Sequence, residues 1–303
     1  MQRIDLGGNT MHFCRLVTRA LCSAAFSVSL IAASPAQTPP SHPPVEAFGA
    51  LPAISDVSLS PDGKHIAALQ TYHGRTAVVI YEVGAPPGTV PAILIDEMHY
   101  IVGARWAKND RLLVTIYEAT RPNLSSTRTY PFLRMFSVDT KAQNPVMLLQ
   151  NSQWTDYQNN TARIADLTLD DPENIIMPQF AAHLTYTSLD LYKVSVRTGR
   201  GELALQGKAM QNGMENTIYY IMDGHGHVVG RVDQIQEPLV DHLRINKDEY
   251  WQEVAQFDAE TDHGADLVGM SVDGAQLVRF DTSDESGTTS VAGFEIATGR
   301  TVS

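Results

Sequence analysis

The chain has 303 residues, of which 43% are hydrophobic and 18% are charged, and its formal net charge is −12. This composition is typical of a soluble globular protein, and the length suffices for one large domain or two ordinary ones. The acidic balance argues against nucleic acid as a partner, because the field would repel the phosphate backbone.

Residues 1–36 are predicted to be a signal peptide. Arg15 and Arg19 precede an apolar run over 21–33, and small residues end the segment. A basic region, an apolar region and a small-residue cleavage site in this order are typical of secretory leaders. A transmembrane anchor is the alternative, but it needs about 18 consecutive apolar residues, and this run is shorter and contains serines. We therefore expect export to the periplasm or beyond.

Removal of this leader changes the cysteine content and the charge. Both cysteines, Cys14 and Cys22, lie inside it, so the mature chain is expected to have no disulfide and no thiolate metal site. Because the leader holds three arginines and one aspartate, 19 basic and 33 acidic side chains remain, a net charge of −14. No cluster of Lys and Arg and no second hydrophobic stretch follows, so we expect no nucleic-acid partner and no membrane contact after cleavage.

Residues 37–51 are expected to form a Pro-rich linker and lead-in, and the fold is expected to occupy 52–303. The first clear signal of a strand, a turn and a second strand is Ser55–Leu69. Its centre is Ser-Pro-Asp-Gly at residues 60–63, between two runs of apolar residues. Pro presets φ for the turn and Gly accepts a positive φ, so this stretch predicts a β-hairpin.

Strand patterns separated by turns then recur along the chain, and no long amphipathic helix is expected. Each unit has the size of a propeller blade. The third unit is expected to begin with a strand over Arg163–Leu169, and the fifth is expected to lack its fourth strand. The five units cover residues 53–97, 99–151, 162–207, 217–258 and 265–303.

Internal echoes support this series. Ser-Val-Asp-Gly at residues 271–274 repeats the turn at 60–63, and Leu191–Arg200 is repeated 100 positions later at Val291–Arg300, with a looser copy at Leu133–Lys141. A β-sandwich with coincidental turn spacing is the alternative, and five units in the same internal order disfavour it. The predicted fold class is therefore all-β, a β-propeller of about five four-stranded blades.

Several of these segments resemble the N-terminal β-propeller of S9 (prolyl oligopeptidase-like) serine peptidases, in the bacterial exported branch. The resemblance spans residues 45–303, although TolB-like propellers share the Ser-Pro-Asp-Gly turn. It implies a ring of seven or eight blades, of which five units would be an incomplete part, followed by an α/β-hydrolase domain. The segments are Ser58–Leu69, Arg105–Val114, Ala162–Ile176, Tyr192–Arg200 and Trp251–Gly274.

The catalytic signature of that family is missing from this sequence. A nucleophile elbow needs G-x-S-x-G, and the nearest approach surrounds Ser271, where the residue two positions on is Asp273. Ser271 is therefore interpreted as a turn serine, and no catalytic residue is predicted. Without a nucleophile the chain alone is expected to be inactive. The resemblance implies that its partners are peptides and a hydrolase domain, with the propeller limiting access to short peptides.

No metal-binding or cofactor-binding residue is predicted either. A zinc site needs three or four convergent ligands, and calcium loops need alternating oxygen ligands with Gly at the bend. Gly199 and Gly299 are interpreted as turn glycines, because no helix follows them. The tryptophans are expected to pack between blades. The residue types that could bind a metal are found at His225, His227, His242, His263, Asp170, Asp171 and Asp281–Glu285, and the tryptophans are Trp106, Trp154 and Trp251.

Two functions follow from these patterns. The first is a non-catalytic, substrate-gating propeller portion of an exported S9-type serine peptidase, with the hydrolase domain missing from this chain. Dipeptidyl-peptidase relatives hold a substrate amine with adjacent glutamates, but the sequence has no Glu-Glu pair, so no binding residue is predicted. The alternative is a stand-alone TolB-like periplasmic binding or scaffold propeller. It needs a closed ring, against which the expected missing strand argues.

Overall fold

The protein is described here from a computed structural model. The chain divides into two compact units, Met1–Ala50 and Leu51–Ser303. The predicted signal peptide and nearly all of the linker lie outside the described residues. Within the described ranges the chain forms no α-helix, and no helix is long and apolar enough to cross a membrane. The structure describes residues 53–120, 129–155, 158–182, 186–208, 215–247, 250–259, 267–271, 273–282, 288–298 and 300–302.

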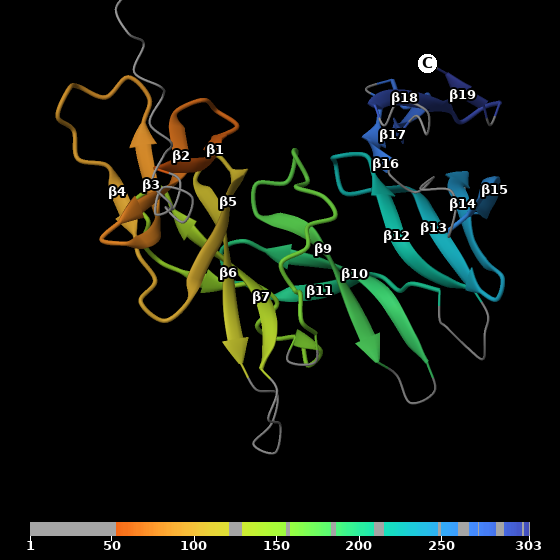
Figure 1. Ribbon diagram of the computed structural model, residues 1–303, viewed down its shortest axis with the longest axis horizontal. Coiled ribbons are helices and arrows are strands. Elements are labelled where there is room, and N and C mark those ends of the chain that lie inside the picture. The colour runs from red at the N-terminus through yellow and green to blue at the C-terminus, as the bar shows by residue number, and fades with distance from the viewer. Residues whose placement is uncertain are drawn as a thin grey trace, which may run out of the picture. The chain divides into compact units, whose positions relative to one another are not determined.

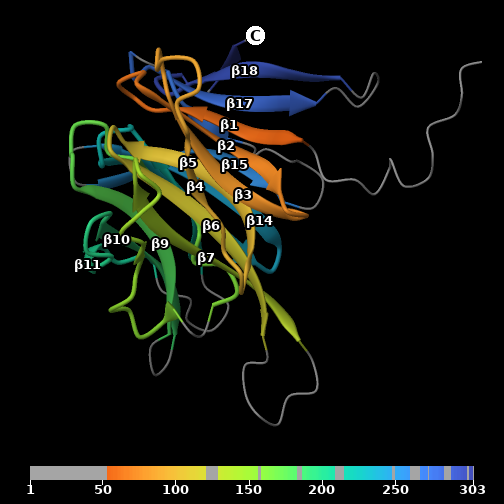
Figure 2. The same cartoon turned by 90° about the vertical axis from the view of Figure 1, so that its left-hand side faces the viewer.

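The described residues form five antiparallel sheets that follow one another in chain order (Figure 1). The first two sheets are meanders in which each strand pairs with the next, and Figure 2 shows β5, β6 and β7 in that order. The first sheet contains β1 (Ile54–Leu59), β2 (His65–Tyr72), β3 (Arg75–Glu82) and β4 (Ala92–Leu94). The second contains β5 (Tyr100–Lys108), β6 (Arg111–Thr120), β7 (Tyr130–Asp139) and β8 (Val146–Met147).

The other three sheets repeat this meander. The third contains β9 (Asn174–Ala182), β10 (Thr187–Ser195) and β11 (Gly201–Leu205). The fourth contains β12 (Asn216–Met222), β13 (Val228–Gln236), β14 (Leu239–Lys247) and β15 (Tyr250–Asp258). The fifth contains β16 (Leu267–Met270), β17 (Gln276–Thr282), β18 (Thr289–Glu295) and β19 (Arg300–Val302). The predicted fold class, an all-β series of propeller blades, is therefore confirmed.

Two expectations about single strands were wrong. Residues 163–169 form no strand; only an isolated bridge joins Asp166 to Ile176. The backbone of Thr168 has a φ of 48°, and this left-handed conformation ends the extended run. The fifth sheet does have its fourth strand, because Arg300–Val302 pairs with the end of β18. Three residues are too few to give a sequence pattern, and the free edge of β18 supplies the pairing.

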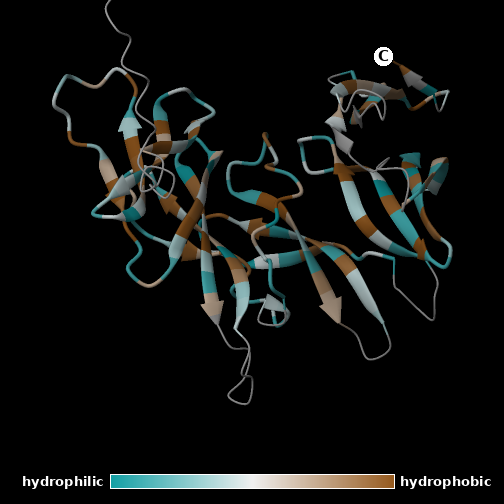
Figure 3. Ribbon diagram, viewed as in Figure 1, coloured by the Kyte–Doolittle hydropathy of each residue, from teal (hydrophilic) through white to brown (hydrophobic). Residues whose placement is uncertain are grey.

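The sheets are joined by apolar side chains that face one another. Hydrophobic and hydrophilic residues alternate along the strands (Figure 3), so that each strand offers apolar side chains to a neighbouring sheet. One cluster joins the first and second sheets through Val78 and Leu112, and the next joins the second and third through Leu113 and Ile175. Further clusters join the third sheet to the fourth and the fourth to the fifth.

The two turns that echo each other in sequence have the same hydrogen bonds. Ser60 Oγ donates to Asp62 Oδ1 over 2.7 Å and accepts from the backbone N–H of His65 over 2.9 Å. Ser271 Oγ donates to Asp273 Oδ1 over 2.6 Å and likewise accepts a backbone N–H, that of the residue five positions on. These serine bonds hold the pKa of each aspartate below its ordinary value. The repeated turn thus closes the first hairpin in both blades.

Candidate binding site

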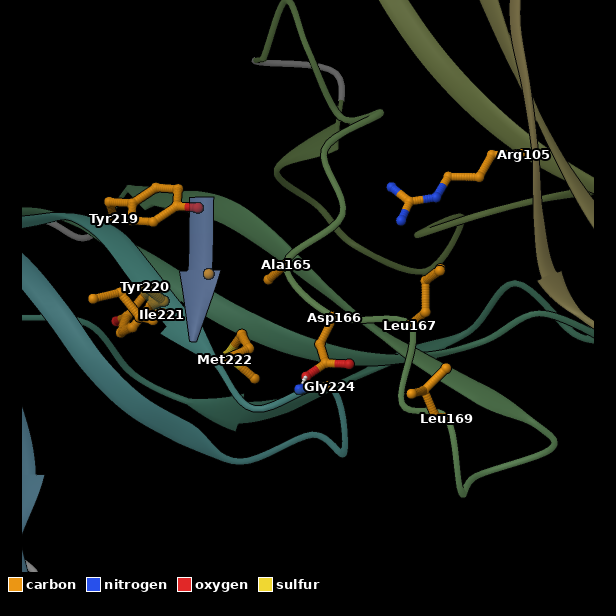
Figure 4. A pocket seen from close by; sticks show the side chains of 11 residues that line it. Arg105, Ala165, Asp166, Leu167, Leu169, Tyr219, Tyr220, Ile221, Met222 and Gly224 are labelled. Carbon is orange, nitrogen blue, oxygen red and sulfur yellow. Dashed lines mark hydrogen bonds between the residues drawn. The ribbon is translucent and has the colours of Figure 1, made fainter. Parts of the chain in front are cut away.

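A pocket of about 290 Å³ lies where the first segments of successive sheets meet (Figure 4). Arg105 comes from β5, and Gly269 belongs to β16. The segment before β9 contributes Ala165, Asp166, Leu167 and Leu169, and β12 contributes Tyr219–Met222. A smaller cavity of about 70 Å³ shares Ala165 and Tyr219 with it and adds Arg163. None of these residues was singled out from the sequence.

Strand β5 fixes one wall of the pocket. Ala104 and Trp106 are 3% exposed and face the core, so the alternation of the strand leaves Arg105 on the open face. The strand is tied to the first sheet by two bonds: the Trp106 Nε1–H donates to the carbonyl of Ser58 over 3.1 Å, and Asp56 Oδ2 accepts the N–H of Ala104 over 2.6 Å.

The carboxylate of Asp166 joins the third unit to the fourth. Its side chain is buried, and Oδ1 accepts the N–H of Thr168 over 2.6 Å. Oδ2 accepts the N–H groups of Gly224 and Gly226 over 2.9 and 3.2 Å, both from the turn between β12 and β13. These three charge-assisted bonds hold the turn between β12 and β13 against the segment before β9, and both segments line the pocket.

Lys108 of β5 forms hydrogen bonds with the same segment. Its Nζ is buried and donates to the carbonyl oxygens of Leu167 and Thr168 over 2.5 and 2.9 Å, and to the hydroxyl of Thr168 over 3.1 Å. Burial lowers the pKa of Lys108, while nearby carboxylates oppose that shift. The segment before β9 is therefore anchored on both sides although it pairs as a strand at one bridge only.

Adjacent tyrosines of β12 face opposite ways. Tyr220 is 5% exposed, its hydroxyl donates to the carbonyl of Leu189 over 2.8 Å, and burial raises its pKa. Tyr219 is 43% exposed, and Figure 4 shows its hydroxyl directed toward the pocket from the side opposite Arg105. Among the described residues, neither the guanidinium of Arg105 nor the hydroxyl of Tyr219 has a hydrogen-bond or ion-pair partner.

The polar side chains of the pocket lining determine which ligand atoms it suits. The lining side chains that have no polar partner among the described residues are Arg105 and Tyr219, and both can donate hydrogen bonds to carbonyl and carboxylate oxygens. The pocket lining contains no serine, cysteine or histidine. No group of three or more His, Cys, Asp or Glu side chains in the described part of the chain could hold a metal ion.

The three described histidines that could have held a metal are not among the residues that line the pocket. His225 Nδ1 contacts Asp170, and His227 Nδ1 lies 2.8 Å from Asp223 Oδ2. His242 belongs to β14 and lies 2.9 Å from Glu253 Oε2 through Nδ1. His263 lies outside the described residues, as do positions 283–285 of the second acidic cluster. His225, His227 and His242 thus contact three different carboxylates.

Other residues named from the sequence lie in the framework of the blades. Asp171 forms an ion pair with Lys193 at 2.9 Å and accepts backbone N–H bonds, which hold its pKa well below the ordinary value despite burial. Trp106 is in the core, and the Trp251 ring lies 4.2 Å below the guanidinium of Arg231. Gly199 has a φ of 71°, as a turn glycine does.

The fourth sheet contains a charge network that the sequence does not reveal. Arg244 makes a bidentate pair with Glu215 at 2.7 and 2.8 Å, and also contacts Asp233, which is fully buried. The bond from Arg244 and the contact with Lys208 lower the pKa of Glu215 to about 2. These residues come from different strands and the segment before β12, so only the strand register brings them together.

Comparisons with known proteins give no family for this chain: no family model and no curated protein matches it. Among solved structures it is similar to the acylaminoacyl peptidase of Pyrococcus horikoshii, with 11% identity over 83% of this chain and 38% of that one, at a TM-score of 0.43. The isopeptidase AtxE2 has 13% identity over 84% of this chain and 41% of that one, with a TM-score of 0.34.

TolB from Acinetobacter baumannii is similar at the same level, with 13% identity, a TM-score of 0.34, and coverage of 82% of this chain and 51% of that one. The chain therefore spans about two fifths to one half of the length of these three structures. At these values the likeness does not assign a function.

Proposed function

We propose that this chain is the substrate-gating propeller portion of an exported S9-type serine peptidase, in which a hydrolase domain outside these 303 residues performs the hydrolysis. The observation that carries the proposal is the pocket formed by the first segments of four successive units, in which the donors of Arg105 and Tyr219 have no partner among the described residues. The resemblance of several blade segments to that family supports the same function, and the expected leader at residues 1–36 supports export.

An exposed apolar strand supports the idea that further blades complete the ring. Val57 and Leu59 of β1 are 65% and 58% exposed, and Ile54 is 58% exposed. Three large apolar side chains on one short strand are costly to leave in water, and such patches commonly mark a contact surface. In a ring of seven or eight blades, a neighbouring blade would cover this strand.

Two observations test the proposal. The purified full chain is incubated with chromogenic short peptides, and no hydrolysis is expected; turnover that a serine-directed inhibitor abolishes would contradict the non-catalytic role. The gene is also read beyond the codon for Ser303. An in-frame continuation, or one interrupted by a single frameshift, with G-x-S-x-G a few hundred residues on is expected. A downstream region without that signature would argue against the peptidase.

A stand-alone TolB-like periplasmic binding or scaffold propeller is the second candidate. The observation that favours it is β19, which completes the fifth sheet and removes the objection that this sheet lacks a closing strand. Sedimentation and denaturant unfolding of the full chain separate the two candidates. A monomer that unfolds cooperatively favours the stand-alone protein, whereas self-association through uncovered sheet faces favours the incomplete ring.

A further inference from the structure

We infer that the pocket between the first segments of the blades binds the C-terminal carboxylate of a short peptide, with Arg105 and Tyr219 as the groups that recognise it. The inference rests on the proposed function, because it names the part of a peptide substrate that the propeller would hold. It goes further in assigning a site and a ligand chemistry: a peptide that ends in a free carboxylate and whose last residue has an apolar side chain.

The guanidinium of Arg105 is available for a ligand. Two other arginines illustrate the contrast, because their guanidinium groups are engaged: Arg197 pairs with Asp110 and Glu173, and Arg244 lies within its carboxylate network. Arg105 is exposed and has no partner among the described residues, although the chain carries more acidic than basic side chains. A guanidinium presents parallel N–H donors that match the two oxygens of a carboxylate.

The single carboxylate in the pocket lining is already occupied. Asp166 is the one acidic residue among those that line it. Its two oxygens accept three backbone N–H groups, from Thr168, Gly224 and Gly226. These bonds weaken the repulsion that the negative charge of Asp166 would exert on a carboxylate ligand. They also leave little acceptor capacity for an ammonium group. The pocket therefore favours the carboxyl end of a peptide over its amino end.

The rest of the lining suits an apolar side chain and a second hydrogen bond. Tyr219 offers its hydroxyl from the wall opposite Arg105 (Figure 4), while Leu167, Leu169 and Met222 supply apolar surface. Apart from Gly269 and its two chain neighbours, no atom of the described residues lies within 4 Å of the place where a side chain at Gly269 would begin, so this wall is open. A volume of about 290 Å³ is at the small end of ligand pockets. It fits the last one or two residues of a peptide.

The test compares two forms of one peptide on the full chain. N-acetyl-Ala-Ala-Leu with a free carboxylate and its C-terminal amide are titrated by calorimetry against the wild type and R105M. The wild type is expected to bind the acid about tenfold or more tightly than the amide, because hydrogen bonds to charged groups contribute that much. R105M is expected to remove the difference while its affinity for the amide stays unchanged.

Arg200 provides a matched control. It is exposed, has no side-chain partner among the described residues, and lies outside the pocket lining. R200M removes the same charge and should keep the preference for the acid. Y219F should weaken binding of the acid severalfold through loss of one hydrogen bond. The unfolding midpoint of each variant is measured in parallel, and Y219F serves as the second probe if R105M does not fold.

The outcomes separate this inference from the proposed function. Equal affinity for the acid and the amide, or a preference for the acid that persists in R105M, overturns the carboxylate site. Neither result contradicts the proposed role of the propeller in gating peptides. Acetate binding as tightly as the peptide acid overturns it in favour of a simple anion site. Failure of both peptide forms to bind the wild type overturns the inference together with peptide gating by this pocket.

Discussion

Replacing Asp166 with Asn tests whether one buried carboxylate joins the third and fourth blades. Asp166 is 5% exposed and accepts three backbone N–H groups at 2.6 to 3.2 Å. Asn has one acceptor oxygen, so it can keep either the bond from Thr168 or the bonds from the glycine turn. Its amide group would then face N–H donors. Loss of a hydrogen bond to a charged group costs about 1.5–3 kcal/mol, so we expect D166N to lower the free energy of unfolding by about 2–4 kcal/mol.

The assay is denaturant unfolding followed by tryptophan fluorescence, since Trp106 is buried in the core of the second sheet and reports on unfolding. D170N is the matched control, because Asp170 lies on the same segment and its side chain is 80% exposed. An exposed pair contributes little, so D170N should change the free energy by less than about 1 kcal/mol. Equal losses of unfolding free energy in D166N and D170N would refute the idea that the Asp166 carboxylate holds the third and fourth blades together.

Three further predictions concern other parts of the fold. The pKa of Glu215 falls from 4.5 to about 2 on folding, so the stability that its charge contributes is complete above pH 4.5 and is lost as the pH falls from 4.5 toward 2. E215Q should be less stable than the wild type by about 3 kcal/mol at pH 7. In thermal melts the difference in stability between the two proteins should shrink in acid, and a constant difference would contradict this. Ser60 is 2% exposed, whereas Ser271, at the equivalent position of the turn in the fifth blade, has an intermediate exposure. S60A should lower the free energy of unfolding by about 1–2 kcal/mol and S271A by less, and the reverse order of denaturant midpoints would contradict this. The double change of Val57 and Leu59 to Ser should leave the free energy of unfolding within about 1 kcal/mol and reduce self-association in sedimentation; unchanged association would argue against β1 as a contact surface.

The blade series could be predicted because its signals are local. Alternation of apolar and polar residues places one face of a strand in the core, and Ser-x-Asp-Gly encodes a turn wherever it occurs. The two copies at Ser60 and Ser271 form the same hydrogen bonds although they lie in different blades. The two errors have local causes too. Thr168 adopts a left-handed backbone within the segment expected to be a strand, and β19 is too short to show alternation.

The pocket could not be predicted, because its polar groups are far apart in sequence. Arg105, Asp166 and Tyr219 come from three different units, and each looks unremarkable in its own segment. Asp166 in particular accepts N–H groups from a turn 58 and 60 positions away. The sequence by itself determined which residues form strands and turns, since those depend on neighbours along the chain. Only the stacking of one sheet on the next decided which side chains share a pocket, because that depends on contacts between blades.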